Sequence, residues 1–163
     1  MTQTDQDTDI QLREIVIHET PSFFPTLSLE DARSIYSDTL EFEADRCIFS
    51  EGDPGIGAYY VVAGSVKVVG SSPEGVDILF GKLGPGEIFG EMALIDNHPR
   101  AASVITLTPC TLGFISSQTF GPFIEERSDL AFRLINFICL SLFKHIRRID
   151  KSYSDIRKRL NPA

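Results

Sequence analysis

Two neighbouring runs of sequence decide how this chain is interpreted: Phe89-Gly90-Glu91-Met92-Ala93-Leu94-Ile95 and Pro99-Arg100-Ala101-Ala102-Ser103-Val104. A carboxylate such as that of Glu91 accepts hydrogen bonds from sugar hydroxyls, and a guanidinium such as that of Arg100 donates a fork of hydrogen bonds to phosphate. The pair therefore predicts a site for a ribose that carries a cyclic phosphate, with Glu91 on the ribose and Arg100 on the phosphate.

The backbone between these two side chains suits the same task. Gly90 has no Cβ, so the chain can approach the sugar closely. Met92 and Ala93 are expected to begin a short helix whose free N–H groups and positive dipole end face the phosphate. The alternative is a buried ion pair between Glu91 and Arg100 with no ligand, although desolvation of both charges would offset much of its Coulomb energy.

Short strand-type segments separated by turns follow from residue 41 onward. The expected strands cover residues 59–69, with a break at Gly64, and then 76–83, 101–106 and 111–116. Turn residues fill the gaps, and we expect the last two strands to pair with each other around Pro109. Many short strands at nearly regular spacing indicate an antiparallel β-roll or jelly-roll.

Helical patterns flank this roll. Ser28-Leu29-Glu30-Asp31 has the form of a capping box and predicts a helix through about residue 40. Its expected buried face consists of Phe23, Phe24, Leu27, Ile35 and Leu40. The sequence thus predicts a mainly β, α+β chain: a disordered acidic tail over residues 1–10, a β-roll with an N-terminal helix over 11–127, and a long helix over 128–160.

The last helix carries apolar residues at alternating steps of four and three. They are Ile135, Cys139, Leu142, Ile146, Ile149, Tyr153, Ile156 and Leu160. A heptad seam of this length is hard to bury on one small roll, so it predicts a parallel two-stranded coiled coil and a homodimer. In the alternative, residues 130–143 pack on the roll and the basic remainder is a solvated or fraying helix.

The two opening runs resemble the phosphate-binding cassette of the cyclic nucleotide-binding domain family. Residues 48–53, 59–68 and 83–91 are similar to further signatures of the family, in the family's order, so the resemblance covers about residues 20–145. It implies ligand contacts from Phe89, Gly90, Glu91, Met92, Ala93, Arg100, Ala101, Ala102 and Ser103. In catabolite-activator-like members the long helix reaches the base, which implies a place for His145 near an adenine.

The resemblance also bears on loop geometry and on ligand choice. Family members often have a glycine where this chain has Ala44-Asp45-Arg46, which puts the geometry of that turn in doubt. Members selective for cyclic GMP often have a threonine directly after the cassette arginine. Ala101 takes that position here and has no hydroxyl, so cyclic AMP is expected as the ligand ahead of cyclic GMP, with no further cofactor.

The residues do not favour an enzyme. His18, His98 and His145 are scattered and include no H-x-H pair, so a cupin-type metal site is not indicated. Among the carboxylates only Glu91 has an evident ligand role, whereas acid–base hydrolysis requires two acids that face one cleft. The three cysteines are far apart in the sequence, which argues against an iron–sulfur cluster.

Composition points to the cytoplasm and away from charged surfaces. The formal net charge of −8 argues against whole-surface affinity for nucleic acid or anionic lipid. An odd number of separated cysteines suggests no disulfide framework, and the N-terminus lacks the features of a secretory signal. The most apolar stretch, residues 134–143, is too short to span a bilayer.

The chain ends at Asn161-Pro162-Ala163, and we expect neither a helix-turn-helix nor direct DNA binding. The resulting hypothesis is a stand-alone second-messenger receiver whose ligand repositions the last helix for an unknown effector protein. The alternative is an interaction or scaffold module in which the nucleotide site is degenerate and the acidic front and basic tail recruit partners.

Overall fold

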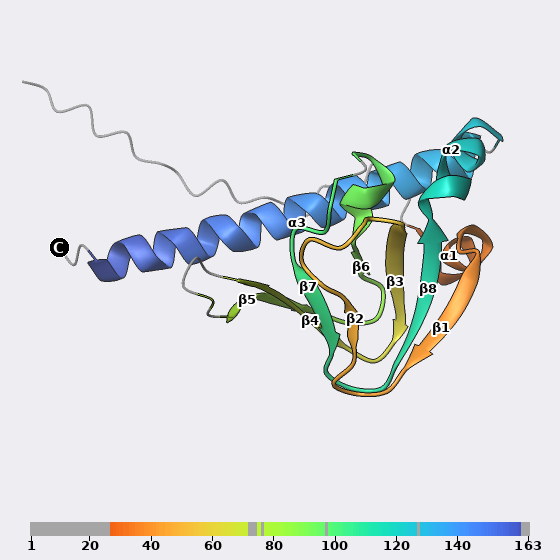
Figure 1. The fold of residues 1–163 in the computed structure, drawn as a ribbon. Helices are drawn as coiled ribbons and strands as arrows, with labels where there is room; N and C mark the ends of the chain where they lie inside the picture. Colours follow the sequence, from red (N-terminus) through yellow and green to blue (C-terminus); the bar gives the residue numbers. More distant parts are fainter. Residues whose placement is uncertain (1–26, 72–74, 76, 97, 127, 161–163) are drawn as a thin grey trace, which may run out of the picture.

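The computed structural model describes residues 27–71, 75, 77–96, 98–126 and 128–160. The predicted disorder of residues 1–10 and the predicted packing of Phe23 and Phe24 lie outside these residues. The described strands form two antiparallel sheets, in the orders β1-β8-β3-β6 and β2-β7-β4-β5 (Figure 1). Their bounds are β1 Asp38–Phe42, β2 Cys47–Phe49, β3 Gly57–Ala63, β4 Val66–Ser71, β5 Asp77–Leu83, β6 Ile88–Phe89, β7 Ser103–Thr106 and β8 Cys110–Ser116.

Four helical segments accompany the sheets in the part of the chain that the structure describes. They are α1 Leu29–Ile35, the 3-10 helix η1 Glu91–Leu94, α2 Ser117–Glu126 and α3 Ser128–Leu160. The predicted fold class, a mainly β roll with a short N-terminal helix, a short cassette helix and a long C-terminal helix, is confirmed. The sequence did not predict α2 as a separate helix, because Gly121 and Pro122 in its interior are typical of a loop.

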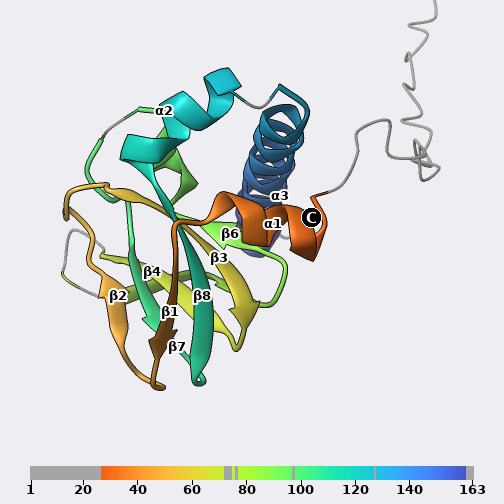
Figure 2. The same cartoon turned by 90° about the vertical axis from the view of Figure 1, so that its right-hand side faces the viewer.

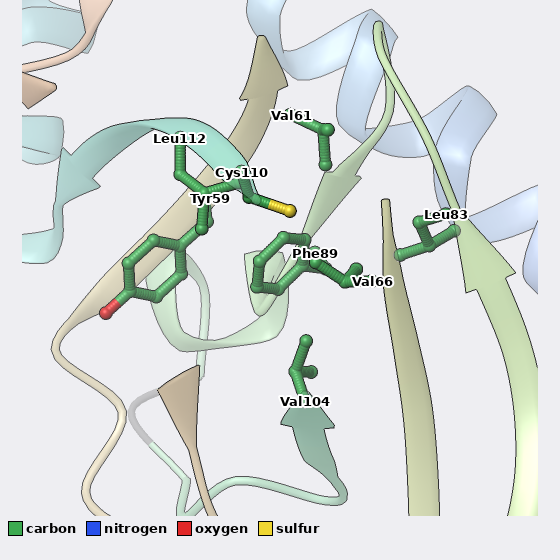
Figure 3. Packing of buried hydrophobic residues seen from close by; sticks show 8 residues of the cluster. All are labelled: Tyr59, Val61, Val66, Leu83, Phe89, Val104, Cys110 and Leu112. Atoms are coloured by element: carbon green, nitrogen blue, oxygen red, sulfur yellow. The ribbon is translucent and has the colours of Figure 1, made fainter. Parts of the chain in front are cut away.

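The two sheets enclose the main core. Side chains from β3, β4, β5, β6, β7 and β8 meet there (Figure 3): Tyr59, Val61, Val66, Leu83, Phe89, Val104, Cys110 and Leu112. The rings of Tyr59 and Phe89 stack with their centroids 5.3 Å apart. This core fixes the start of the cassette, because Phe89 is the residue immediately before Gly90.

The N-terminal helix is shorter than predicted. The capping box is formed as expected, since the Ser28 hydroxyl accepts from the Asp31 N–H and the Asp31 carboxylate accepts from the Ser28 N–H. The helix ends at Ile35 because Tyr36 is extended, with ψ 140°, and residues 38–42 pair with β8 as β1. Leu40 therefore packs from a strand, and the prediction of a helix through residue 40 is wrong.

The expected pairing of the last two strands is also wrong. β7 pairs with β2 and β4, whereas β8 pairs with β1 and β3, so the chain crosses from one sheet to the other between them. The two strands follow each other closely in sequence, but their hydrogen-bond partners come from distant parts of the chain.

The turn that lacks the family glycine has an unusual backbone. Asp45 has φ 58°, in the left-handed region that aspartate tolerates better than most residues. The Thr106 hydroxyl donates to the Glu43 carbonyl oxygen at 2.7 Å and braces this turn. Asp45 therefore adopts a left-handed conformation of the kind that glycine adopts most readily.

The long helix α3 lies across the roll and runs beside α1 (Figures 1 and 2). Leu134 and Ile138 of α3 pack with Ala58, Ile88 and Ile115 of the roll in a second buried cluster. No helix in the described part of the chain has the length and apolar character needed to cross a membrane.

Candidate functional site

The cassette begins at Gly90, which directly follows strand β6 and has a left-handed backbone conformation. Gly90 has φ 69°, and a Cβ on this residue would lie 2.5 Å from Nη1 of Arg100. Both the backbone conformation and the close approach therefore require glycine. The η1 turn that follows buries Glu91 and Ala93, and it leaves Met92 exposed.

Arg100 is held by backbone carbonyls of the roll. Its Nη1 donates to the Gly90 carbonyl oxygen at 2.9 Å, and its Nη2 donates to the Gly57 carbonyl oxygen at 2.7 Å. The guanidinium carbon lies 4.0 Å from the centroid of the Phe49 ring, at cation–π distance. Arg100 is only 6% exposed, so its position is set by the roll and not by solvent.

One donor of this guanidinium has no protein acceptor. Within the described residues, Nε of Arg100 is buried and makes no hydrogen bond. Burial lowers the pKa of Arg100 from its ordinary value, while charge interactions with Tyr59, Asp53 and Glu91 oppose that change. The Nε–H of this buried guanidinium can still donate a hydrogen bond to an anionic acceptor.

The backbone of Arg100 is fixed by the turn before β3. Its N–H donates to the Asp53 carbonyl oxygen, and its own carbonyl accepts from the Gly52 N–H, both at 2.8 Å. Ser103 takes part in the same contact, because its hydroxyl accepts from the Glu51 N–H at 2.8 Å.

Glu91 has a partner on α3. Its Oε1 lies 3.6 Å from Nδ1 of His145, and the Glu91 residue as a whole is only 4% exposed. Among the described residues Glu91 and Arg100 form no ion pair with each other, so the buried ligand-free pair considered from the sequence is not present. The two charges face different partners across one short turn.

The remaining predicted residues differ in how close they come to this centre. Phe89 lies in the core. Ala93 packs so closely against Gly55 that a Cβ added to Gly55 would lie 2.6 Å from the Ala93 Cβ. Ala101 is exposed, and Ala102 is half-buried. The structure therefore brings Gly90, Glu91, Arg100 and His145 together, while Met92 and Ala101 face solvent.

Several contributors were not among the predicted site residues. Phe49 supplies the ring beside Arg100, Gly57 supplies a carbonyl acceptor, and Asp53 fixes the backbone. Gly57 lies 43 positions from Arg100 in sequence. No spacing rule connects residues so far apart, although Phe49 and Asp53 do fall within the run 48–53 that was noted for its resemblance.

No cluster of three or more metal-ligating side chains occurs in the residues that the structure describes.

Comparison with known proteins places this geometry in context. A family model described as "cyclic nucleotide-binding domain" matches residues 39–127. The chain is 26% identical over 117 residues to a CRP-like cAMP-activated global transcriptional regulator of Mycobacterium tuberculosis, covering 72% of this chain and 50% of the relative. It is 36% identical over 99 residues to a cAMP-dependent protein kinase regulatory subunit of Yarrowia lipolytica, covering 60% of this chain and 25% of the relative.

A solved structure is similar as well. The c-di-GMP-responsive global regulator of Xanthomonas campestris matches with a TM-score of 0.71 and 27% identity, covering 77% of this chain and 61% of that one. The chain spans half or less of the length of the two curated relatives, so the likeness concerns one domain of those proteins.

Proposed function

The chain belongs to the cyclic nucleotide-binding domain family, and on that basis we propose that it is a cyclic nucleotide receiver, with cyclic AMP as its ligand. The observation that carries the proposal is the buried guanidinium of Arg100, which is braced by two carbonyls and has Nε left over. In this proposal Arg100 holds the cyclic phosphate, and Glu91 accepts a hydrogen bond from the ribose 2′-hydroxyl.

Cyclic AMP is favoured over cyclic GMP by one side chain and by two relatives. Ala101 offers no hydroxyl to a guanine amino group, and the names of the Mycobacterium and Yarrowia relatives both specify cAMP. The Xanthomonas regulator responds to c-di-GMP, so this dinucleotide belongs in the test as well.

The output of the proposed receiver is α3. The side of the helix that packs on the roll contains Ala131, Leu134 and Ile138, all buried. Of the predicted seam, Leu142 packs with the second buried cluster, whereas Ile135, Ile146 and Ile149 are 41%, 52% and 64% exposed. The side chains of Tyr153, Ile156 and Leu160 lie outside what the structure describes. The exposed apolar side chains of the seam support a parallel homodimer through α3.

Cysteine cross-linking tests this dimer directly. In a parallel in-register pair of helices, Cys139 of one copy lies opposite Cys139 of the other. A mild thiol oxidant should therefore give a covalent dimer that Cys139→Ser abolishes and Cys47→Ser retains, since Cys47 is exposed but lies on β2. A monomer at micromolar concentration in equilibrium sedimentation would contradict the proposed homodimer.

We further propose a non-enzymatic role in the cytoplasm, with signalling through an effector protein and without direct DNA contact. All three cysteines are free thiols, which suits a reducing compartment.

Isothermal titration calorimetry tests the ligand. Ligand-stripped protein is titrated with cyclic AMP, cyclic GMP and c-di-GMP, and the expected result is micromolar or tighter binding of cyclic AMP with weaker binding of the other two. Arg100→Ala should abolish binding while the domain stays folded. If no nucleotide binds the wild-type protein and Arg100→Ala changes only stability, the scaffold alternative holds instead.

A further inference from the structure

Glu91 is almost fully buried in the state that the structure describes. The residue is 4% exposed, and the basic group beside its carboxylate, His145, comes from α3 and not from the roll. The roll side of the cassette is fixed by Gly90 and by the packing of Ala93 against Gly55. The group that can leave is therefore the one on the helix.

Resting on the proposed function, we infer that His145 competes with the ribose for Glu91, and that it thereby couples nucleotide binding to the release of α3. In the empty protein the imidazole compensates a buried carboxylate, which would otherwise be costly to leave unpaired. A ribose hydroxyl can take over that compensation only when His145 gives up its place. Ligand and helix are thus alternative partners of one side chain.

A second contact, one helical turn further on, explains why displacement at His145 would matter for the whole helix. Nη2 of Arg148 lies 3.3 Å from Oε1 of Glu87, and its Nη1 lies 3.5 Å from the Lys82 carbonyl oxygen. The side chains of this pair are 44% and 27% exposed, and ion pairs as open as this contribute little to stability. The 145–148 turn of α3 thus contacts the cassette side of the roll through Glu91 as well as through Glu87 and Lys82, so displacement of His145 acts on this same turn.

The direction in which His145→Ala changes the nucleotide affinity distinguishes competition by His145 from a supporting role of His145. A carboxylate has two oxygens, and if Glu91 held His145 and the ribose together, the loss of His145 would weaken nucleotide binding. Competition predicts the opposite. In calorimetry with cyclic AMP, His145→Ala should bind about 5-fold more tightly than the wild type, at the lower end of typical site-to-site couplings.

The matched control is Lys144→Ala, which removes a neighbouring exposed positive charge that makes no ion pair with any described residue. It should leave the affinity unchanged or slightly weaker. Weaker or unchanged binding by His145→Ala would overturn the inference.

A measurement without nucleotide keeps the two proposals apart. Amide hydrogen exchange in the unliganded protein should become faster around residues 141–149 in His145→Ala and stay as in the wild type in Lys144→Ala. If wild-type protein binds no cyclic nucleotide, the proposed function fails, and the competition fails with it. If the wild type binds but exchange in His145→Ala is unchanged, only the coupling to α3 is wrong.

Discussion

The two halves of the cassette differ in what holds them. Among the described residues, the contacts of Arg100 come from the roll: two carbonyls at 2.7 and 2.9 Å, the Phe49 ring and the backbone of Asp53. The ion-pair contact of Glu91 within the same residues is with His145 of α3, at 3.6 Å. The half proposed for the phosphate is therefore already organised, while the half proposed for the ribose depends on where the helix lies.

This difference teaches where a binding site can transmit a signal. A rigid contact favours tight binding, because no free energy is lost in ordering the protein side chain when the ligand binds. A change of helix position needs a contact whose partner differs between the empty and the filled state. In this molecule the two requirements fall on two charges at the ends of one short turn.

The largest expected effect comes from replacing Arg100, the half of the cassette that the roll holds rigidly. Arg100→Ala should lower nucleotide affinity by about 100-fold or more, equal to about 2.7 kcal/mol, because a charged hydrogen-bonding group is lost. Arg100→Lys should recover only part of this, since an ammonium cannot serve both carbonyls and the phosphate as a fork does. Calorimetry measures the affinities, and a thermal melt checks that each variant is folded. An affinity within tenfold of the wild type in Arg100→Ala would show that the phosphate is held elsewhere.

The next effect tests how tightly the rigid half is built. Gly90→Ala places a Cβ against Nη1 of Arg100 and strains a residue with φ 69°, so it should lower the free energy of unfolding by about 1–3 kcal/mol and weaken nucleotide binding. Gly121→Ala in α2 is the control, because a Cβ there meets nothing within 4 Å. It should be neutral or stabilising by up to about 1 kcal/mol. Equal melting temperatures for the two variants would contradict the close approach at Gly90.

A smaller effect is expected from a change at Glu91, the half of the cassette whose contact depends on the position of α3. Glu91→Gln keeps the shape of the side chain and removes its charge, so nucleotide affinity should fall about tenfold, equal to about 1.4 kcal/mol. The same change should free the 145–148 turn of α3 in the empty protein, as seen by faster amide exchange. Arg100→Lys should not have this second effect. Exchange that is fast in both variants would mean that the two halves are not separate.

The smallest effect concerns the other attachment of α3. Arg133 of α3 lies 3.2 Å from Asp31 of α1, and the pKa of Asp31 is lowered by the backbone hydrogen bond from Ser28, by its hydroxyl and by the charge of Arg133. A lowered folded-state pKa means that the stabilisation is present at neutral pH and is lost as the pH falls through that pKa. Asp31→Asn should therefore be slightly less stable than the wild type at about pH 7, and the difference should shrink towards about pH 3 in urea titrations.

This attachment should also be independent of the ligand. Nucleotide affinity should be the same in Asp31→Asn as in the wild type, because Asp31 lies on α1 and contacts α3 at Arg133, three turns before His145. An altered affinity would show that the whole helix, and not only its 145–148 turn, responds to the site.

Local patterns in the sequence were sufficient for the elements whose causes are local. The capping box at Ser28, the break at Gly64 between β3 and β4, and the apolar repeat of α3 are all set by neighbours in the chain. The errors occurred where a distant segment decided the outcome. Residues 38–42 became a strand because β8 offered a free edge, and β7 and β8 were separated because each had a better partner elsewhere.

The sequence by itself determined the class of fold, the carboxylate and the guanidinium of the cassette, and the glycine between them, because these follow from residue chemistry at short spacing. Only the tertiary structure decided what those charges contact. Burial of Arg100 against Gly57, and of Glu91 against His145, joins residues 43 and 54 positions apart. Such partners are chosen by the packing of sheets and helix, and no local pattern records them.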